Sequence, residues 1–429
     1  MSSRDTFTPR GHLRPRVSHS LAATALALLL GVQPVTTDAY LPALPLLTRD
    51  LAAPMEAAQM TMAALVIAFG IALLFWGPIA DRHGRRPVLL VGLTLYAIAS
   101  AFCALAPSID VLLVARIVQG ACMASAVVCA RAMLRDLYEP TEGARIMAVA
   151  LSSLGVIALL SPTLGGLAAT WFGWRGALGI VAVFGVLLLA FVALRLPETL
   201  AQRTTQPMAI KGMIGDWRTI AAHPAFRAWG LLSASTYAGL YVILAATPFV
   251  YMRVFDLSAT AVGFALAGNS LAYIAGTFIC RRLVRNRGLV RAVRFGAVLT
   301  LAGGIGTAAL ALAGIGIAAL GNGGTGITAL ALGGVPPIWA LIVPQWFYLA
   351  AHGIHQPVAH AAITGPFPQR AGTASALGGL MQSAAAFGTG VWLGSVLSTS
   401  IWPLVVGLFV WAACTGFVAL WLVPRGAEA

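Results

Sequence analysis

One acidic side chain in this chain of 429 residues lies well inside an apolar segment, and it belongs to Asp38. The other twelve of the thirteen acidic residues lie in polar stretches or close to the ends of apolar ones. An ionisable residue within an apolar segment is costly to bury, so it usually marks a functional site. Burial favours the protonated acid and a nearby cation favours the carboxylate, so Asp38 is suited to taking up and releasing a proton.

Arg116 is the basic residue best placed to act with Asp38. An apolar helix over 18–44 would carry Asp38 six residues from its end, roughly 9 Å at 1.5 Å per residue. A helix over 109–133, running in the opposite direction, would place Arg116 six residues below the same surface. We therefore expect the two charges to lie at similar depth. An ion pair that merely orients two helices is the alternative, although a packing contact alone rarely justifies burying charge.

The segments that must position these two residues are too apolar for a soluble protein. Apolar residues make up 59% of the chain and charged residues 9%, against about 45–50% and about 25% in soluble domains. Nearly uncharged stretches of about 18 residues or more recur along the whole length, and each can cross a bilayer as a helix. We therefore predict an all-α polytopic membrane protein with twelve transmembrane helices. The predicted spans are residues 18–44, 55–79, 87–106, 109–133, 144–170, 174–196, 226–251, 258–280, 291–316, 337–364, 372–397 and 401–423.

The basic residues predict the orientation of these spans. If the N-terminus is cytoplasmic, 22 of the 27 Lys and Arg residues fall in cytoplasmic loops and tails, and three fall outside. This asymmetry predicts that both termini lie in the cytoplasm, with the spans in the inner (plasma) membrane. The net charge of +14 comes from scattered loops and not from a compact patch, which argues against nucleic-acid binding. The first apolar run is long and lacks a small-residue cleavage site, so we expect a retained helix and not a signal peptide.

The longest polar connection divides the chain into two blocks of six helices. The predicted segments are a basic tail over 1–17, a first bundle over 18–196, a cytoplasmic linker over 197–225 and a second bundle over 226–424. Two such halves around a cavity at the midplane are a known transporter design. A Gly-rich stretch over 303–334 is expected to contain a flexible external loop at Gly321–Gly326, to which we assign no function.

The connection between the second and third spans has an ordered pattern, Gly-x-x-x-Asp-Arg-x-Gly-Arg-Arg. Glycine permits a tight turn, and the arginines would face the cytoplasm and anionic lipid headgroups. The pattern closely resembles a loop of the same form in the major facilitator superfamily. The matching residues are Gly77, Asp81, Arg82, Gly84, Arg85 and Arg86. We expect Asp81 to close a cytoplasmic gate through Arg131 or Arg135 and the start of the helix over 372–397, where negative charge is favoured.

Further motifs resemble one branch of that superfamily, the bicyclomycin and chloramphenicol resistance transporters. Asp38-Ala-Tyr-Leu-Pro-Ala-Leu-Pro is similar to a signature at the end of their first helix, and Arg116-Ile-Val-Gln-Gly is similar to a motif of their fourth helix. The residues that match their helix-5 antiporter motif are Gly155, Pro162, Gly165 and Gly166. The resemblance implies a drug:proton antiporter that uses the proton gradient and needs no cofactor.

We therefore expect a secondary transporter, and not an enzyme, that exports small amphipathic drugs by alternating access. If Asp38 carries the proton, no second membrane acid remains to pair with a cationic drug. The expected substrates are thus neutral or zwitterionic, and the resemblance implies phenicol- or bicyclomycin-like compounds. The side chains expected to line the cavity are Tyr40, Gln119, Tyr237, Tyr241, Asn269, Tyr273 and Gln345. The expected partners are the drug, protons and membrane lipids, and the expected state is a monomer.

Two alternatives stay open. A proton-coupled importer or exporter of a small metabolite would have the same fold. An intramembrane enzyme or receptor would need a catalytic or metal-ligating cluster or a large soluble domain, and the sequence shows neither. His352, His355 and His360 lie in one predicted span, and a metal site is conceivable because positions 352, 356 and 360 share a helix face. Gln356 is a poor ligand and no acid accompanies the histidines, so lining of a polar cavity is favoured over a metal site.

Overall fold

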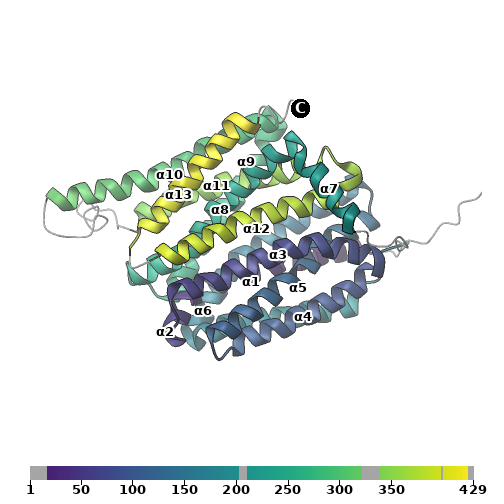
Figure 1. Ribbon diagram of the computed structural model, residues 1–429, viewed down its shortest axis with the longest axis horizontal. Coiled ribbons are helices and arrows are strands. Elements are labelled where there is room, and N and C mark those ends of the chain that lie inside the picture. The colour runs from purple at the N-terminus through teal and green to yellow at the C-terminus, as the bar shows by residue number, and fades with distance from the viewer. Residues whose placement is uncertain (1–16, 202–209, 321–337, 398–399, 424–429) are drawn as a thin grey trace, which may run out of the picture.

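A computed structural model describes residues 17–201, 210–320, 338–397 and 400–423, and over these residues every regular element is helical (Figure 1). In chain order the elements are α1 (His19–Asp38), the 3₁₀ turn η1 (Leu41–Ala43), α2 (Leu44–Asp50), α3 (Met55–His83), α4 (Arg85–Leu105), α5 (Ile109–Leu137), α6 (Pro140–Arg195), α7 (Ile210–Ala222), α8 (Pro224–Arg253), α9 (Ala259–Arg287), α10 (Leu289–Leu320), α11 (Trp339–Thr364), the 3₁₀ turn η3 (Pro368–Arg370), α12 (Ala371–Val396), α13 (Trp402–Phe417) and the π-helical turn η4 (Val418–Leu422). The predicted all-α fold is confirmed.

Eleven of the helices correspond to the twelve predicted spans. The fifth and sixth spans are both in α6, a 56-residue helix that bends at Gly173, where φ is 67° and favours glycine. Within the described residues, nine helices are long and apolar enough to cross a membrane by length and composition, and the long α6 counts among them once. The remaining two spans, α11 and α12, are less apolar because they contain His, Gln, Ser and many Ala and Gly residues.

The first six spans and the last six form two bundles that lie side by side (Figure 1). The bundles meet where α3 packs on α12 and where α6 packs on α9. Glycine permits the second contact, because a Cβ on Gly263 would lie 2.5 Å from the Pro162 carbonyl oxygen and one on Gly166 would lie 2.5 Å from that of Ala259. Small residues commonly allow such close approach between membrane helices.

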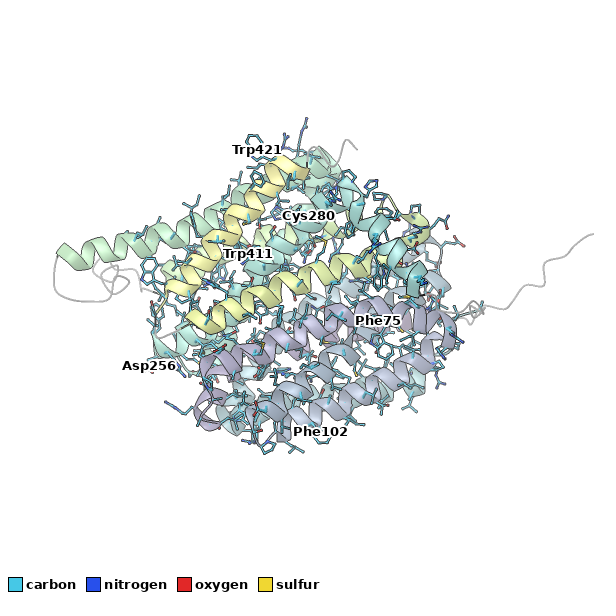
Figure 2. The ribbon with its side chains drawn as sticks, viewed as in Figure 1. Phe75, Phe102, Asp256, Cys280, Trp411 and Trp421 are labelled. Atoms are coloured by element: carbon cyan, nitrogen blue, oxygen red, sulfur yellow. The ribbon has the colours of Figure 1, made fainter. Side chains whose placement is uncertain are left out.

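Large apolar side chains cover the outer surface of both bundles. Phe102 on α4 is 60% exposed and Trp421 in η4 is 58% exposed, and both lie at the periphery (Figure 2). Apolar side chains at such positions suit contact with lipid tails, because the tails are as apolar as the side chains themselves. The outer surface therefore agrees with a protein that crosses the membrane many times.

Two ends of the bundle can be distinguished. Helix α7 lies at one end, where α1 begins and η4 finishes; we call this the α7 end (Figure 1). Helix α2 lies at the other, which we call the α2 end. The predicted linker over 197–225 thus contains helix α7. Residues 202–209 of this linker fall outside the described part. Similarly, α10 continues to Leu320, and the expected loop at Gly321–Gly326 lies beyond the residues that the structure describes.

One helix boundary near the proposed site was predicted wrongly. The first helix was expected to continue through Leu44, but α1 ends at Asp38 and is followed by η1 and α2. Pro42 and Pro45 lack the backbone N–H that a continuous helix would need at these positions, so the chain turns instead. Asp38 is therefore the last residue of α1, next to a break in the helix, and not a residue six positions inside it.

Candidate functional site

Arg116 on α5 is a fully buried cation that faces α1. Its guanidinium carbon lies 3.8 Å from the centre of the Tyr40 ring, which is a cation–π contact. Nη1 donates to the carbonyl oxygen of Thr36 at 3.3 Å and to Oε1 of Gln119 at 2.8 Å. Nε and Nη2 are buried without a hydrogen-bond partner. Because buried polar groups are nearly always paired, two free donors on a buried cation need an explanation.

Hydrogen bonds from the neighbouring helices fix the groups that hold Arg116. Gln119 donates through Nε2 to Oγ of Ser100 on α4 at 2.7 Å. The Tyr40 hydroxyl lies 2.8 Å from that of Thr61 on α3. These contacts join α1, α3, α4 and α5 around one guanidinium. Gln119, which we expected to line the substrate cavity, is instead bonded to Arg116 and Ser100, and Tyr40 packs against the guanidinium.

Asp38 is half-buried, and among the described residues it forms no ion pair with Arg116. Arg116 reaches the carbonyl of Thr36, two residues before Asp38, so the expected similarity in depth agrees with the structure. The static ion pair that the sequence left as the alternative is absent from this conformation, in which the Tyr40 ring lies over the guanidinium. The Asp38 carboxyl instead contacts its neighbour Thr37, whose Oγ1 lies 2.7 Å from Oδ1.

Side chains of the second bundle approach Asp38 from the opposite side. Tyr237 on α8 accepts a hydrogen bond from Nε2 of Gln33 on α1 at 3.4 Å, which links the two bundles. The Tyr241 hydroxyl on α8 and Nε2 of Gln345 on α11 are buried without partners. Asn269 on α9 is also buried. These residues, expected from the sequence to line a cavity, therefore bring several polar atoms with free hydrogen-bonding capacity to the interior.

Two of the histidines of α11, His352 and His355, face into the second bundle. The ring of His352 lies 5.7 Å from that of Tyr273 and 6.3 Å from that of Tyr237, and its Nδ1 is 3.2 Å from the Thr236 hydroxyl. His355 points elsewhere, with Nε2 3.2 Å from the carbonyl oxygen of Val293 on α10. No group of three His, Cys, Asp or Glu residues suited to a metal ion occurs in the described part of the chain. His352 is thus an aromatic neighbour of the two tyrosines.

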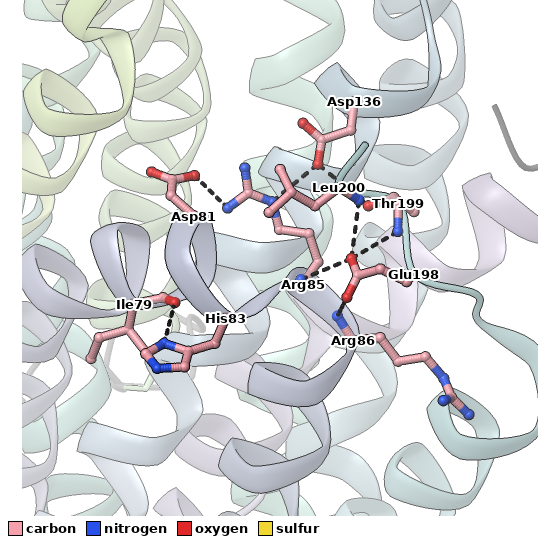
Figure 3. Close-up of polar contacts among 9 residues, drawn as sticks. All are labelled: Ile79, Asp81, His83, Arg85, Arg86, Asp136, Glu198, Thr199 and Leu200. Carbon is pink, nitrogen blue, oxygen red and sulfur yellow. Dashed lines mark hydrogen bonds and ion pairs between the residues drawn. The ribbon is translucent and has the colours of Figure 1, made fainter. Parts of the chain in front are cut away.

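The ordered loop between α3 and α4 forms a network of charges at the α7 end (Figure 3). Nη1 of Arg85 lies 2.6 Å from Oδ1 of Asp81, and Nε of Arg85 lies 3.0 Å from Oδ2 of Asp136 on α5. Arg85 is almost completely buried, whereas Asp81 is half exposed. The expected partner of Asp81 was Arg131 or Arg135, and the structure places Arg85 there, four residues later and just across the turn at Gly84.

Arg131 and Arg135 instead reach across to the second bundle. Nη1 of Arg131 donates to Oγ of Ser375 on α12 at 2.9 Å. The guanidinium of Arg135 lies beside Gly372 at the start of the same helix. The expected link to this helix is therefore present, but the arginines of α5 make it, and not Asp81.

Glu198, which none of the sequence motifs includes, completes this network (Figure 3). Its Oε1 accepts hydrogen bonds from the backbone N–H groups of Arg85, Thr199 and Leu200 at 2.9–3.0 Å, and its Oε2 accepts one from that of Arg86 at 3.3 Å. A carboxylate at this position caps the start of α4, and the positive end of the helix dipole stabilises its negative charge. The single hint in the sequence was an acid directly after the sixth span.

The other residues of the loop fill supporting positions. Gly84 has a φ of 100° and lies against the Glu198 carboxylate, so any side chain here would be strained and would collide with the cap. Gly77 faces Val128 on α5, and Arg82 is exposed. The loop is therefore a tight turn built around Glu198, with Arg85 directed inward between two carboxylates.

The matched helix-5 residues lie where α6 passes both α1 and α9. Gly165 faces the backbone of Ala39, the residue after Asp38, so closely that a Cβ would overlap its carbonyl group. Gly155 faces Ile274 on α9, while Gly166 and Pro162 make the close contacts with α9 described above. These positions thus pack the backbone of α6 against the break in α1 on one side and against α9 of the other bundle on the other side.

Known proteins resemble the chain over most of its length. The profile of the Major Facilitator Superfamily matches residues 26–321. Multidrug resistance protein D of Escherichia coli (strain K12) is 29% identical over 369 residues, which are 85% of this chain and 86% of that protein. A chloramphenicol resistance protein of Pseudomonas aeruginosa is 38% identical over 192 residues, 43% of this chain and 45% of that protein.

The arrangement of helices resembles that of solved transporters. The crystal structure of a D-xylose-proton symporter has a TM-score of 0.70 to this chain at 18% identity, covering 96% of this chain and 98% of the other. A likeness at this identity concerns the fold. Together with the sequence matches, it confirms the predicted architecture of twelve helices in two bundles and the resemblance to drug-resistance transporters.

Proposed function

The chain belongs to the major facilitator superfamily and is a transporter, and we propose that it exports small amphipathic drugs in exchange for protons. Its relatives include proteins named for resistance to several drugs, which supports efflux as the direction of transport. The matched helix-5 residues, which pack α6 against both α1 and α9, support an antiporter in which the two bundles move relative to one another. Membership of the family is established by the sequence matches, whereas the identity of the drug and the coupling of its export to protons are our proposal.

The observation that carries the proposal is the fully buried Arg116, which has two unpaired donor nitrogens and lies on α5, a helix that packs against α1 and so against the helix of Asp38. A buried cation without a carboxylate is costly unless another state of the protein pairs it. Asp38 is the acid two residues from Thr36, whose carbonyl Arg116 already bonds, although side chains two positions apart on a helix do not face each other, so pairing requires α1 to rearrange. We infer that Arg116 pairs with Asp38 in a second conformation and with Tyr40 and Gln119 in this one.

The hydrogen bonds of Thr37 support a protonated Asp38 in the present conformation. Oγ1 of Thr37 lies 3.0 Å from the carbonyl oxygen of Gln33, one turn earlier, and 2.7 Å from Oδ1 of Asp38. A hydroxyl has one proton to donate, and a helical threonine commonly donates it to the carbonyl four residues earlier. The short contact with Asp38 is then best satisfied when the carboxylic acid donates to Thr37. Loss of that proton would leave a carboxylate that attracts Arg116.

The proposed coupling follows from these two states. In the protonated state, Arg116 remains over Tyr40 and the drug site is available. In the deprotonated state, Arg116 moves toward Asp38, which alters the break in α1 and the contact of Ala39 with Gly165. Because the adjacent Gly166 on α6 packs against α9 of the other bundle, protonation and bundle movement become linked. A neutral drug and a proton would thus move in opposite directions during one cycle.

The interior of the second bundle suits a partly aromatic, uncharged substrate. Tyr237, Tyr273 and His352 provide ring surfaces, and the free polar atoms of Tyr241 and Gln345 can bond to hydroxyl, amide or nitro groups. No second acid faces this region from the described helices, so nothing there would compensate a cationic drug. Phenicol-like and bicyclomycin-like compounds fit these requirements.

We further propose that the network at the α7 end controls access from the cytoplasm. The Arg131–Ser375 hydrogen bond joins the bundles there, and it must break when that end opens. Asp81, Arg85 and Asp136 hold the ends of α3, α4 and α5 together, so the first bundle can move as one unit. The positive-inside rule places this end in the cytoplasm, with both termini.

The experiment that tests the proposal uses the purified protein in proteoliposomes loaded with chloramphenicol. An imposed proton gradient should drive export of the drug, and dissipating that gradient with an ionophore should stop it. A susceptibility panel in an efflux-deficient bacterium would define the range of drugs. If neutral drugs do not move, and counterflow with a cellular metabolite is rapid, the alternative of a metabolite transporter with the same fold is correct.

A further inference from the structure

A pocket on the surface of the first bundle lies at the α7 end, between the start of α1, the start of α4 and the end of α6. Its walls include Val17 and Leu21 from the first segment, Arg86 from α4, and Arg195 with Glu198 from the end of α6. Helix ends of this kind lie at the level of lipid headgroups when the helices span a bilayer. The pocket is therefore separate from the interior site around Asp38.

Two arginines supply the charge of this pocket. Nη2 of Arg86 donates to the carbonyl oxygen of Ala193 at 2.8 Å, which fixes the side chain along the wall, and its Nε is buried without a partner. Arg195 is exposed, and within the described residues it forms neither an ion pair nor a side-chain hydrogen bond. Both guanidinium groups thus retain donors that can bind an anion.

The one acid in the pocket does not neutralise these arginines fully. The Glu198 carboxylate accepts four backbone N–H groups, so both of its oxygens are occupied by the chain itself. Its charge also faces the positive end of α4, which offsets part of it. The pocket therefore keeps a net attraction for anions, and its free donors point to a ligand with several acceptor oxygens, such as a phosphate group.

An apolar track leads from the pocket along the outside of α6. Val183, Leu187 and Leu194 are 60%, 63% and 80% exposed, and their spacing of four and seven residues places them on one face of the helix. Leu21 continues the apolar surface into the pocket. A ligand with a phosphate and long hydrocarbon chains would fit both parts, whereas a free phosphate would use only the first.

We propose that this pocket is a specific binding site for one anionic phospholipid of the surrounding membrane. The phosphate lies between Arg86 and Arg195, and an acyl chain follows the face formed by Val183, Leu187 and Leu194. Basic pockets between helices at the cytoplasmic surface suit such headgroups. Because Arg86 is also anchored to Ala193 and its N–H to Glu198, the bound lipid holds the start of α4 to the end of α6. The site does not depend on which drug is transported.

Native mass spectrometry of the full-length protein in detergent tests this site with phosphatidylglycerol and phosphatidylcholine of identical acyl chains. The wild type should retain one phosphatidylglycerol in preference to phosphatidylcholine. Arg195→Gln should weaken that binding about fivefold, since one basic residue near a membrane surface contributes about 1 kcal/mol. The added change Arg86→Gln should remove the preference. Arg285→Gln is the matched control, because it removes one exposed arginine from the α7 end in the other bundle.

Three results would overturn the proposal. The first is an equal affinity of the wild type for the two lipids. The second is a loss in Arg285→Gln as large as that in Arg195→Gln, which would show that total charge and not this pocket governs binding. The third is displacement of the lipid by glycerol 3-phosphate at equal concentration, which would show that the acyl track contributes nothing. Unchanged thermal unfolding of Arg195→Gln would confirm that a loss of lipid does not result from misfolding.

Discussion

Replacing Asp38 by asparagine tests the proposed coupling most directly. Asparagine has nearly the same size and can still contact Thr37, so the break in α1 and the packing of Ala39 on Gly165 should persist. It cannot exchange a proton and cannot pair with Arg116 as a carboxylate. We therefore expect Asp38→Asn to bind drugs within a few-fold of wild-type affinity and to lose all proton-driven accumulation.

The expected size of the effect follows from the charge that moves. We propose that Asp38 is the one acid that carries the coupling proton, so one proton enters for each neutral drug that leaves. One net charge then crosses per cycle, which is worth about 2.3 kcal/mol per 100 mV. This free energy corresponds to a drug gradient of about 50-fold at 100 mV and equal pH on both sides. Asp38→Asn should show no gradient, while exchange of drug for drug continues.

The assay uses proteoliposomes in which valinomycin sets the potential and radiolabelled chloramphenicol reports transport. Asp110→Asn serves as the matched control, because it removes an exposed acid from the first turn of α5 and should leave the gradient unchanged. A gradient of tenfold or more in Asp38→Asn would refute the assignment of Asp38. Wild-type transport of a neutral drug that ignores the potential would refute the one-charge cycle, and strong export of cationic dyes would refute the expected substrate class.

Asp81→Asn should reduce the transport rate several-fold, because it removes one carboxylate from the network that holds the ends of α3, α4 and α5 together. Insertion should stay normal, because Arg85 keeps its pair with Asp136. Transport rates per inserted molecule measure this effect, and wild-type rates would contradict it. Glu198→Ala should lower the free energy of unfolding by about 1–2 kcal/mol, because the cap on α4 is lost. Glu139→Ala is the control and should leave that free energy unchanged, because Glu139 is exposed and makes no capping hydrogen bond. Thermal melting in detergent measures both effects. Reporter fusions at Gly11 and Gly426, both outside the described residues, should each report the cytoplasm, and an external signal from either would contradict the orientation.

The fold was predictable from sequence because a membrane restricts the available structures. Backbone polar groups inside hydrocarbon must bond within their own segment, so each long apolar run becomes a helix regardless of its neighbours. The twelve spans and the position of the Asp81–Arg86 loop follow from this local rule. Asp38 also stood out locally, because a single acid in an apolar run is rare. Even the bend at Gly173 falls between two runs that the sequence separates.

The partners of these side chains were decided by the tertiary structure. Arg116 could be assigned a depth from its position in its helix, but the rotation of α5 and the turn after Asp38 place Tyr40, and not Asp38, over its guanidinium. Likewise, Asp81 pairs with Arg85, and Glu198 reaches back more than one hundred residues to cap α4. Hydropathy records how deep a residue lies and nothing about the direction in which its helix faces. That direction depends on packing between glycine-lined surfaces of distant helices, which the complete bundle alone determines.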